Sequence, residues 1–360
     1  MFMNIMIAGG GTGGHLFPGV AIAEEFLRRD SRHQILFVGT DRGLEKRILG
    51  GLGFSLRTID VEGVKGKGLT KMLKALLKIP GSLMQAATII SDFKPAIVIG
   101  VGGYASGPAV LAAFLRGIKT AIAEQNAIPG LTNRILGRFA ARIFVSFAET
   151  GKWFAKRKTI VTGNPIRTTF VASGQEVEKR DEFFRILVFG GSQGAHAVNE
   201  AVIESLEYLQ HLKDKIRFTH QTGMDDKDNV ARRYKDRGMD AVVEPFIMDM
   251  AAAYRSADLL ICRAGATSIA EITAMGKASI LIPFPYAIND HQTKNAQVLV
   301  RGGAAKMIPQ QELSGRRLAE VIENMYSHPE VLRDMKRASG QLGNARAAAD
   351  VVDACMALVH

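Results

Sequence analysis

Cysteines, aromatic residues and long apolar runs are scarce in this chain of 360 residues. It contains two cysteines, Cys262 and Cys355, and aromatic residues make up only 7%. Two cysteines do not make a disulfide framework, and neither they nor the eight histidines have zinc-site spacing, so we expect a reducing cytoplasm. No apolar run approaches the roughly 20 residues that span a membrane. The start, Met1–Ala8, lacks the basic segment of a secretory signal and predicts a first strand instead.

Acidic residues are in short supply only in the first half. Residues 1–163 contain 22 Lys and Arg against 10 Asp and Glu, whereas residues 164–360 contain 24 and 25. The excess of basic over acidic residues that gives the net charge of +11 therefore lies in the first half. A basic surface attracts nucleic acid, an anionic membrane or a phosphorylated ligand, and charge alone does not choose among them.

One acid-free stretch, between Glu62 and Asp92, is also amphipathic. Its leucines recur at helical spacing beside lysines, a pattern that favours binding to an anionic membrane surface. The alternative is a helix packed on the sheet with its lysines in water. The residues predicted to contact the membrane are Leu69, Leu73, Leu76, Leu77, Lys71, Lys74 and Lys78.

Short apolar runs alternate with helical patterns along the whole chain. Most of the runs are rich in β-branched residues and lack polar alternation, as is typical of parallel strands covered on both faces. Strands are predicted at residues 4–8, 35–38, 97–101, 120–123, 143–145, 186–189, 216–220, 241–243, 259–262 and 279–282. Helical patterns between them, such as 20–29 and 197–209, predict βαβ units and an α/β fold.

A weak internal repeat predicts two similar domains. A strand runs into a glycine loop at Gly9–Gly14 and again at Gly190–Ala195, an offset of half the chain. The hinge is expected at Gly163–Pro165, where Gly and Pro punctuate the sequence and the charge balance changes. We therefore expect doubly wound domains at 1–163 and 164–340, and a final helix at 341–360 that can pack back on the first domain.

The first glycine loop and the histidine after it form a candidate catalytic segment. Gly9–Gly14 contains G-x-G-x-x-G between a strand and a helix, which suits a phosphate, although an ordinary turn is the alternative. A dinucleotide site also needs an acid at the end of the second strand; Asp41 comes late, which weakens a dehydrogenase interpretation. His15 follows directly. A histidine titrates near neutrality and can serve as a general base, or it can simply cap the turn.

Further loops follow other predicted strands. In Gly190–Gly194 the open backbone and the Ser192 hydroxyl suit a diphosphate. Gly100–Pro108 forms a third glycine loop, and Glu124 ends a strand as a second candidate base or a ligand for sugar hydroxyls. Ordinary turn and cap chemistry is the alternative for each.

Two polar segments of the second half complete the candidates. In Arg263–Glu271, Thr267 or Ser268 can cap the next helix, and Glu271 either completes a capping box or accepts hydrogen bonds from a ribose. Residues 281–296 run from an apolar strand through prolines into a polar cluster, which indicates a binding loop. None of these segments has metal or catalytic-triad spacing.

Seven of these segments, in order, carry a family resemblance. They are Gly9–Pro18, Gly102–Pro108, Glu124–Asn133, Gly163–Arg167, Gly190–Gly194, Arg263–Glu271 and Pro283–Asn295. Together they resemble the MurG family, the UDP-GlcNAc transferases of peptidoglycan synthesis, over nearly the whole chain. The resemblance implies a GT-B fold, in which two Rossmann-like doubly wound domains face each other across a cleft.

The resemblance also implies a reaction. GlcNAc would pass from UDP-GlcNAc to the 4-hydroxyl of MurNAc in undecaprenyl-diphosphate-MurNAc-pentapeptide, with inversion at the anomeric carbon. Such a displacement needs a base at the acceptor hydroxyl and stabilisation of the departing diphosphate. His15 is the expected base and Glu124 its rival or helper. Because Arg167, a hydroxyl and helix N-termini can stabilise the diphosphate, we expect no obligatory metal ion and no cofactor.

The resemblance assigns the remaining site residues. Those expected to bind UDP-GlcNAc are Thr12, Gly13, Gly14, Asn126, Arg167, Ser192, Ile247, Ala266, Thr267, Ser268, Ile269, Ala270, Glu271 and Gln292. Ile247 would meet the uracil and Glu271 the ribose. Those expected to bind the acceptor are Gly103, Tyr104, Ser106 and Asn133. The expected location is the cytoplasmic face of the cell membrane as a peripheral protein, with other cell-wall synthesis proteins as further partners and no nucleic acid.

Three alternatives stay open on the sequence. One is another GT-B enzyme, such as a diacylglycerol galactosyltransferase or a UDP-GlcNAc 2-epimerase, against which Glu124–Asn126 and Gly103–Pro108 argue. A second is an NAD-dependent oxidoreductase, which would not explain the loops of the second half. A third is a non-enzymatic protein that binds nucleic acid or membrane, for which several glycine loops would be superfluous.

Overall fold

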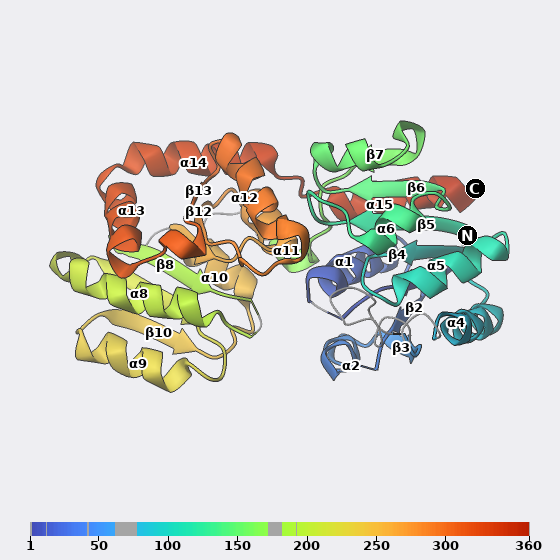
Figure 1. Ribbon diagram of the computed structural model, residues 1–360, viewed down its shortest axis with the longest axis horizontal. Coiled ribbons are helices and arrows are strands. Elements are labelled where there is room, and N and C mark those ends of the chain that lie inside the picture. The colour runs from blue at the N-terminus through green and yellow to red at the C-terminus, as the bar shows by residue number, and fades with distance from the viewer. Residues whose placement is uncertain are drawn as a thin grey trace. The chain divides into compact units, whose positions relative to one another are not determined.

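The chain folds into two α/β units. The computed structural model describes residues 2–11, 13–41, 43–61, 78–171, 182–191 and 193–359. One unit comprises Met1–Thr168 together with Ala345–His360, and the other comprises Thr169–Asn344 (Figure 1). The chain therefore passes into the second unit once and returns to the first for its last helix.

The first unit is built on a seven-stranded sheet in the order β3-β2-β1-β4-β5-β6-β7, with all neighbouring strands parallel. Its strands are β1 (Asn4–Ala8), β2 (Gln34–Gly39), β3 (Ser55–Thr58), β4 (Ile97–Gly100), β5 (Lys119–Glu124), β6 (Arg142–Val145) and β7 (Thr159–Val161). Its helices are α1 (Gly13–Arg29), α2 (Gly43–Gly51), α4 (Ile79–Phe93), α5 (Ser106–Leu115), α6 (Leu131–Leu136) and α15 (Ala347–Val359), with 3₁₀ turns at Ala148–Trp153 and Lys156–Lys158.

Both faces of this sheet are buried, as its apolar strands require. Ile5 and Ile7 of β1 pack in one core cluster with residues of α1 and α15, whereas Met6 and Ala8 belong to the cluster beneath α4 and α5. Figure 1 shows the C-terminal helix α15 among the elements of this unit. Arg29 at the end of α1 holds α15 against this unit: its guanidinium donates to the Ala349 carbonyl at 3.1 Å and pairs with the Asp353 carboxylate.

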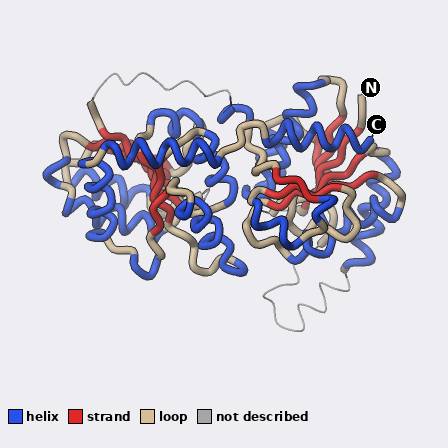
Figure 2. The backbone as a smooth tube through the Cα atoms, turned by 90° about the horizontal axis from the view of Figure 1, so that it is seen from above, coloured by secondary structure: helices blue, strands red, loops and turns tan. Residues whose placement is uncertain are grey.

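The second unit repeats the design on a six-stranded parallel sheet in the order β10-β9-β8-β11-β12-β13. Its strands are β8 (Phe184–Phe189), β9 (Ile216–Gln221), β10 (Asp240–Glu244), β11 (Leu259–Cys262), β12 (Ala278–Leu281) and β13 (Ala305–Met307). Its helices are α7 (Thr168–Val171), α8 (His196–Tyr208), α9 (Lys227–Asp236), α10 (Met250–Ser256), α11 (Ala266–Ala274), α12 (His291–Arg301), α13 (Gly315–Ser327) and α14 (Pro329–Leu342), with 3₁₀ turns at Gln210–Leu212, Ile288–Asp290 and Gln310–Glu312. Figure 2 shows helices on both faces of each sheet.

All ten predicted strands are present, each within two residues of its predicted bounds. Sequence reasoning missed β3, β7 and β13, and all three lie at sheet edges. An edge strand has one neighbour and leaves side chains in water, so it needs no continuous apolar run. In β3 three of the four residues are exposed. The apolar pattern therefore finds the strands in the middle of a sheet more readily than those at its edges.

Each sheet has one point at which the strand order reverses, and there the loops diverge. In the first sheet this point lies between β1 and β4, and in the second it lies between β8 and β11. Open parallel sheets bind ligands beyond the carboxyl ends of the strands at such a point. In the part of the chain that the structure describes, no helix has the length and apolarity needed to cross a membrane.

The second unit buries a histidine in its core. His220 on β9 is fully buried, with Nδ1 3.1 Å from the Tyr234 hydroxyl and Nε2 3.0 Å from Asn199 Oδ1. The Asn199 amide nitrogen donates to the Thr222 carbonyl and to Asp226, so Oδ1 is its acceptor and His220 Nε2 carries a proton. Burial lowers the pKa of His220 to about 3. The ring is therefore neutral in the folded chain.

This burial predicts a pH-dependent stability. Between the pKa of an unfolded histidine and the lowered pKa of His220, only the unfolded chain binds the proton, so stability is lost as pH falls. His220→Gln should reduce the fall in unfolding free energy between about pH 6.5 and pH 5 by up to roughly 1.4 kcal/mol per pH unit. Urea unfolding followed by circular dichroism measures it, with His328→Gln at an exposed site as the control. Equal pH slopes for the parent and His220→Gln would contradict the expectation.

Candidate active site

The loop between β1 and α1 requires a glycine at residue 10. Gly10 has φ +140°, and a Cβ atom there would lie 1.8 Å from Glu45 Oε1. The Glu45 carboxylate, buried at the start of α2, accepts hydrogen bonds from the amides of Gly11 and Thr40, the latter at 3.0 Å. An internal carboxylate thus occupies a loop amide that a dinucleotide phosphate would use, a further argument against the oxidoreductase alternative.

His15 lies in the first turn of α1, beside the loop that follows β4. Its Nδ1 is 3.1 Å from Gln125 Oε1, at the carboxyl end of β5. A Cβ atom on Gly102 would lie 2.5 Å from the same nitrogen, so glycine at φ +93° makes room for the ring. The elements after β1, β4 and β5 therefore meet at the imidazole. Gln125 received no role from the sequence; its position two residues after the predicted strand 120–123 was the signal available.

Glu124 is the neighbour of Gln125, and its carboxylate holds a loop. Oε1 accepts from the Asn126 amide at 3.0 Å and from its side chain at 3.3 Å. Oε2 accepts from the Gly130 amide at 3.0 Å and from Asn133 Nδ2 at 2.9 Å. Glu124 is buried, and this geometry gives it the task of shaping residues 124–133. As a base it would have to give up some of these hydrogen bonds.

The residues predicted to contact the acceptor divide into two kinds. Ser106 and Asn133 are buried: the Ser106 hydroxyl donates to the Ala8 carbonyl at 2.6 Å, and Asn133 donates to Glu124 and to the Ala123 carbonyl. Tyr104, by contrast, is 37% exposed. Gly103 has φ +80° and packs so closely on the first loop that a Cβ atom would lie 2.3 Å from the Gly10 carbonyl oxygen.

Two predicted donor contacts from the first half, Gly13 and Gly14, begin α1, and Asn126 lies in the loop bound by Glu124. Arg167 is half-buried, with its guanidinium 4.5 Å from the centre of the Phe17 ring, a cation–π distance.

Some of the predicted residues lie outside the described part of the chain. They are Thr12 of the donor set and Leu69, Lys71, Leu73, Lys74, Leu76 and Leu77 of the predicted membrane segment. Lys78 is described, and its ammonium pairs with Asp60 at 3.0 Å.

In the second unit, a glutamine joins the glycine loop to the segment predicted to meet uracil. Gln221, buried at the end of β9, donates to the Gly191 carbonyl at 2.8 Å and accepts from the Ile247 amide at 2.8 Å. Ile247 is half-buried and its neighbour Phe246 is exposed. Ser192 lies outside the described residues. Gln221 is the last residue of β9 and, like Gln125 just after β5, received no role from the sequence.

Helix α11 begins one turn earlier than a capping box would allow. Its N-cap is Gly265, so neither Thr267 nor Ser268 caps the helix, and the capping interpretation of Glu271 is wrong. Thr267, Ser268 and Ala270 are half-buried, whereas Ala266, Ile269 and Glu271 are buried. Burial and the nearby Glu271 charge raise the pKa of the Cys262 thiol at the end of β11. The Glu271 carboxylate therefore lies near the carboxyl edge of the sheet.

The loop after β12 is clamped from β11. Arg263 donates to the carbonyls of Ile282 and Pro283, both at 3.2 Å, and to Gln310 Oε1 at 2.7 Å. Burial lowers its pKa. Gln292 in the first turn of α12 accepts from the Phe284 amide at 3.0 Å. The predicted binding loop is therefore held at both ends.

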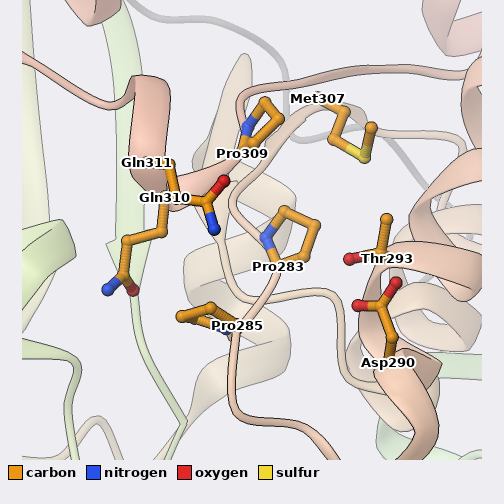
Figure 3. A pocket seen from close by; sticks show the side chains of 8 residues that line it. All are labelled: Pro283, Pro285, Asp290, Thr293, Met307, Pro309, Gln310 and Gln311. Atoms are coloured by element: carbon orange, nitrogen blue, oxygen red, sulfur yellow. The ribbon is translucent and has the colours of Figure 1, made fainter.

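A cavity of about 340 Å³ lies beside this loop in the second unit. It is lined by Pro283, Pro285, Asp290, Thr293, Met307, Pro309, Gln310 and Gln311 (Figure 3). In Figure 3 the polar ends of Asp290 and Thr293 lie together on one side of it. Among the described residues, no group of three or more His, Cys, Asp or Glu side chains is arranged to hold a metal ion.

Family models match both halves of the chain. The glycosyltransferase family 28 N-terminal domain matches residues 5–145, and the C-terminal domain of the same family matches residues 185–352. These two matches cover the glycine loops after β1 and β8 and the strands on both sides of each switch point.

Individual proteins match over the full length. The UDP-N-acetylglucosamine–N-acetylmuramyl-(pentapeptide) pyrophosphoryl-undecaprenol N-acetylglucosamine transferase of Syntrophus aciditrophicus is 62% identical over 360 residues, covering 100% of both chains. The crystal structure of Acinetobacter baumannii MurG superposes with a TM-score of 0.79 at 32% identity, covering 98% of each chain. UDP-GlcNAc 2-epimerase from Neisseria meningitidis, solved with UDP-GlcNAc bound, has a TM-score of 0.70 at 13% identity and covers 98% of this chain and 100% of its own, which shows a shared fold alone.

The fold prediction is therefore confirmed: two parallel α/β units of the GT-B kind. With both family domains present in order and a full-length relative at 62% identity, this chain belongs to glycosyltransferase family 28.

Proposed function

We propose that the chain transfers GlcNAc from UDP-GlcNAc to the 4-hydroxyl of MurNAc in undecaprenyl-diphosphate-MurNAc-pentapeptide, a step of peptidoglycan synthesis. The observation that carries the proposal is the 62% identity, over the full length of both chains, to a transferase of that name. The UDP-GlcNAc 2-epimerase is only 13% identical to this chain, so the similarity between the two is one of fold alone. The oxidoreductase alternative is disfavoured by Glu45, whose carboxylate binds the first glycine loop.

In this reaction His15 serves as the general base. The acceptor oxygen attacks the anomeric carbon of GlcNAc, its proton passes to the imidazole, and the bond to UDP breaks with its electron pair on the diphosphate. Among the described residues the His15 ring makes a single hydrogen bond, through Nδ1, which leaves Nε2 for this proton. Glu124 acts as a positioning residue that shapes the loop next to the base.

The second unit holds the donor. Helices α8 and α11 begin at its switch point, where their N-termini favour a diphosphate, and Ser192 adds a hydroxyl. Ile247, whose amide Gln221 fixes, meets the uracil, and Glu271 the ribose. Ala266–Ala270 and Gln292 line this subsite. By resemblance Arg167 supplies a positive charge to the donor, and Thr12, Gly13, Gly14 and Asn126 are further donor contacts.

The acceptor is held at the carboxyl edge of the first sheet. Gly103 and Tyr104 offer a backbone and a partly exposed phenol there, while Ser106 and Asn133 support the loops from within. No side chain of this set carries a charge, so the acceptor's diphosphate needs helix N-termini or basic side chains of this half.

Acceptor-dependent release of UDP tests the whole proposal. The purified chain is given UDP-GlcNAc with and without a short-chain analogue of the lipid acceptor, in the presence of EDTA. We expect UDP release only with the acceptor, and unchanged by the chelator, because positive charge and helix N-termini stabilise the leaving group. Thermal stabilisation by UDP-GlcNAc without release would leave the donor site intact and reject the acceptor. Neither release nor stabilisation would reject the proposed function.

Replacement of the base should act on turnover rather than on donor binding. His15→Ala should lower kcat roughly 10²- to 10⁴-fold and leave the affinity for UDP-GlcNAc within about twofold. Steady-state kinetics and calorimetric titration measure the two effects.

Glu124→Gln is the matched comparison, because it removes a negative charge but keeps the length of the side chain. It should lower the melting temperature, through lost hydrogen bonds to the loop, and reduce kcat less than His15→Ala does. A kcat for His15→Ala equal to that of the parent would assign the base elsewhere.

We further propose that the first unit docks on an anionic membrane as a peripheral protein. The basic amphipathic segment 65–85 carries the proposal. Where the structure describes its surroundings, helices α4 and α5 pack against each other and expose Met84 at 72% and Leu115 at 69%. Arg116 and Lys119 are exposed next to them in sequence. Apolar side chains beside cations suit an interface of acyl chains and anionic headgroups.

Replacement of Leu73, Leu76 and Leu77 by Ser should weaken binding to phosphatidylglycerol vesicles by about tenfold or more, since each Leu loses apolar burial. Sedimentation with vesicles measures the bound fraction. The control triple, Tyr208→Ser, Val242→Ser and Leu342→Ser, removes exposed apolar side chains from the second unit. Equal binding of the mutant and the parent, with both folded by circular dichroism, would reject docking through this segment.

A further inference from the structure

Gln125 is buried next to the proposed base, and each end of its amide has a partner. Its side chain is 1% exposed. The amide nitrogen lies 3.1 Å from the Val101 carbonyl and 3.3 Å from the Ala123 carbonyl. The amide oxygen lies 3.1 Å from His15 Nδ1. One side chain therefore links the ends of β4 and β5 to the first turn of α1.

These contacts fix which end of the amide faces the histidine. A carbonyl oxygen can only accept, so the end near Val101 and Ala123 must be the NH₂ group. The reversed amide would place its oxygen against two carbonyl oxygens and lose both hydrogen bonds. Because Oε1 also only accepts, the hydrogen bond to His15 requires a proton on Nδ1.

We propose that Gln125 is a positioning residue that locks neutral His15 in the Nδ1–H tautomer and thereby presents the Nε2 lone pair to the acceptor hydroxyl. The inference rests on the proposed function for its catalytic meaning, but the tautomer itself is a property of the free protein. In the transfer step Nε2 takes the hydroxyl proton, the oxygen forms its bond to the anomeric carbon, and the diphosphate leaves with the electron pair.

The surroundings of the ring support an orienting role for a neutral group. Gly102 lies on the Nδ1 side, where a Cβ atom would come within 2.5 Å, so only glycine there leaves room for the ring in this position. Glu124, the sequence neighbour of Gln125, is bound to Asn126, Gly130 and Asn133. Glu45 is bound to Gly11 and Thr40. The Gln125 amide thus sets the tautomer without adding a charge.

Nuclear magnetic resonance of histidine-labelled protein tests the tautomer without substrate. Free neutral imidazole side chains favour the Nε2–H form, so an Nδ1–H form at His15 reports an imposed hydrogen bond. Ring nitrogen and carbon shifts, recorded above the titration range of histidine and assigned by loss of the signal in His15→Ala, distinguish the two forms. We expect Nδ1–H in the parent. A parent His15 in the Nε2–H form would overturn the proposal, whatever the variants do.

Gln125→Met then tests the cause. It keeps the length and apolar volume of the side chain but removes the acceptor, so His15 should shift toward the Nε2–H form. Because the Nε2 lone pair is then lost, kcat of Gln125→Met should fall roughly 10- to 100-fold, while its KM for UDP-GlcNAc stays within about twofold of the parent value. A His15 that keeps the Nδ1–H form in Gln125→Met would reject Gln125 as the cause.

Thr150→Val is the matched control. The buried Thr150 hydroxyl donates to the carbonyls of Asn126 at 3.0 Å and Ala127 at 3.2 Å, so it supports the same loop without touching His15. Its loss should lower stability and leave the tautomer unchanged; a shift equal to that in Gln125→Met would mean general loosening of the loop and overturn the proposal. If the parent shows Nδ1–H but no acceptor-dependent UDP release, the proposed function fails while the tautomer assignment stands.

Discussion

The reversal of strand order in each sheet is the constraint on which the candidate site depends. Between β1 and β4, and between β8 and β11, neighbouring strands send their helices to opposite faces, so the loops above them part. Backbone amides and helix N-termini are left there without helical partners. The chain fills these positions with glycine loops and with buried polar side chains, Glu45 and Gln125 in one unit and Gln221 in the other.

Much of this arrangement could be predicted from the sequence because it has local signals. Apolar runs marked the central strands, and the two glycine loops marked the switch points. The edge strands β3, β7 and β13 lacked a continuous apolar run because only one side of each is paired. The start of α11 was misjudged for a related reason: Thr267 and Ser268 are good capping residues, but Gly265 takes the cap because the turn after β11 ends there.

The contacts made by the supporting residues of the site could not be predicted from the sequence. Gln125 and Gln221 act on groups that are distant in the chain, His15 in one case and Ile247 in the other. Such hydrogen bonds depend on the order of the strands, which no local pattern states. Glu124 could be recognised as a strand-terminal acid, but its use depends on how the following loop folds back onto its carboxylate. The sequence shows which polar side chains follow the strands, and the order of the strands in the sheet determines which groups these side chains contact.

The pair Glu124–Gln125 shows how that decision is made. Successive residues of an extended chain point to opposite sides. Glu124, the last residue of β5, serves the loop before α6, and Gln125, which follows it, reaches α1. The charged member faces amides that donate to it, and the neutral member faces the histidine. If the two residues were exchanged, a carboxylate beside His15 would favour the protonated ring, which cannot accept a proton. An amide in place of Glu124 could not accept hydrogen bonds from all four donors of the loop. The order of these two residues therefore keeps the carboxylate in the loop and places a neutral amide beside the ring, as the proposed base requires.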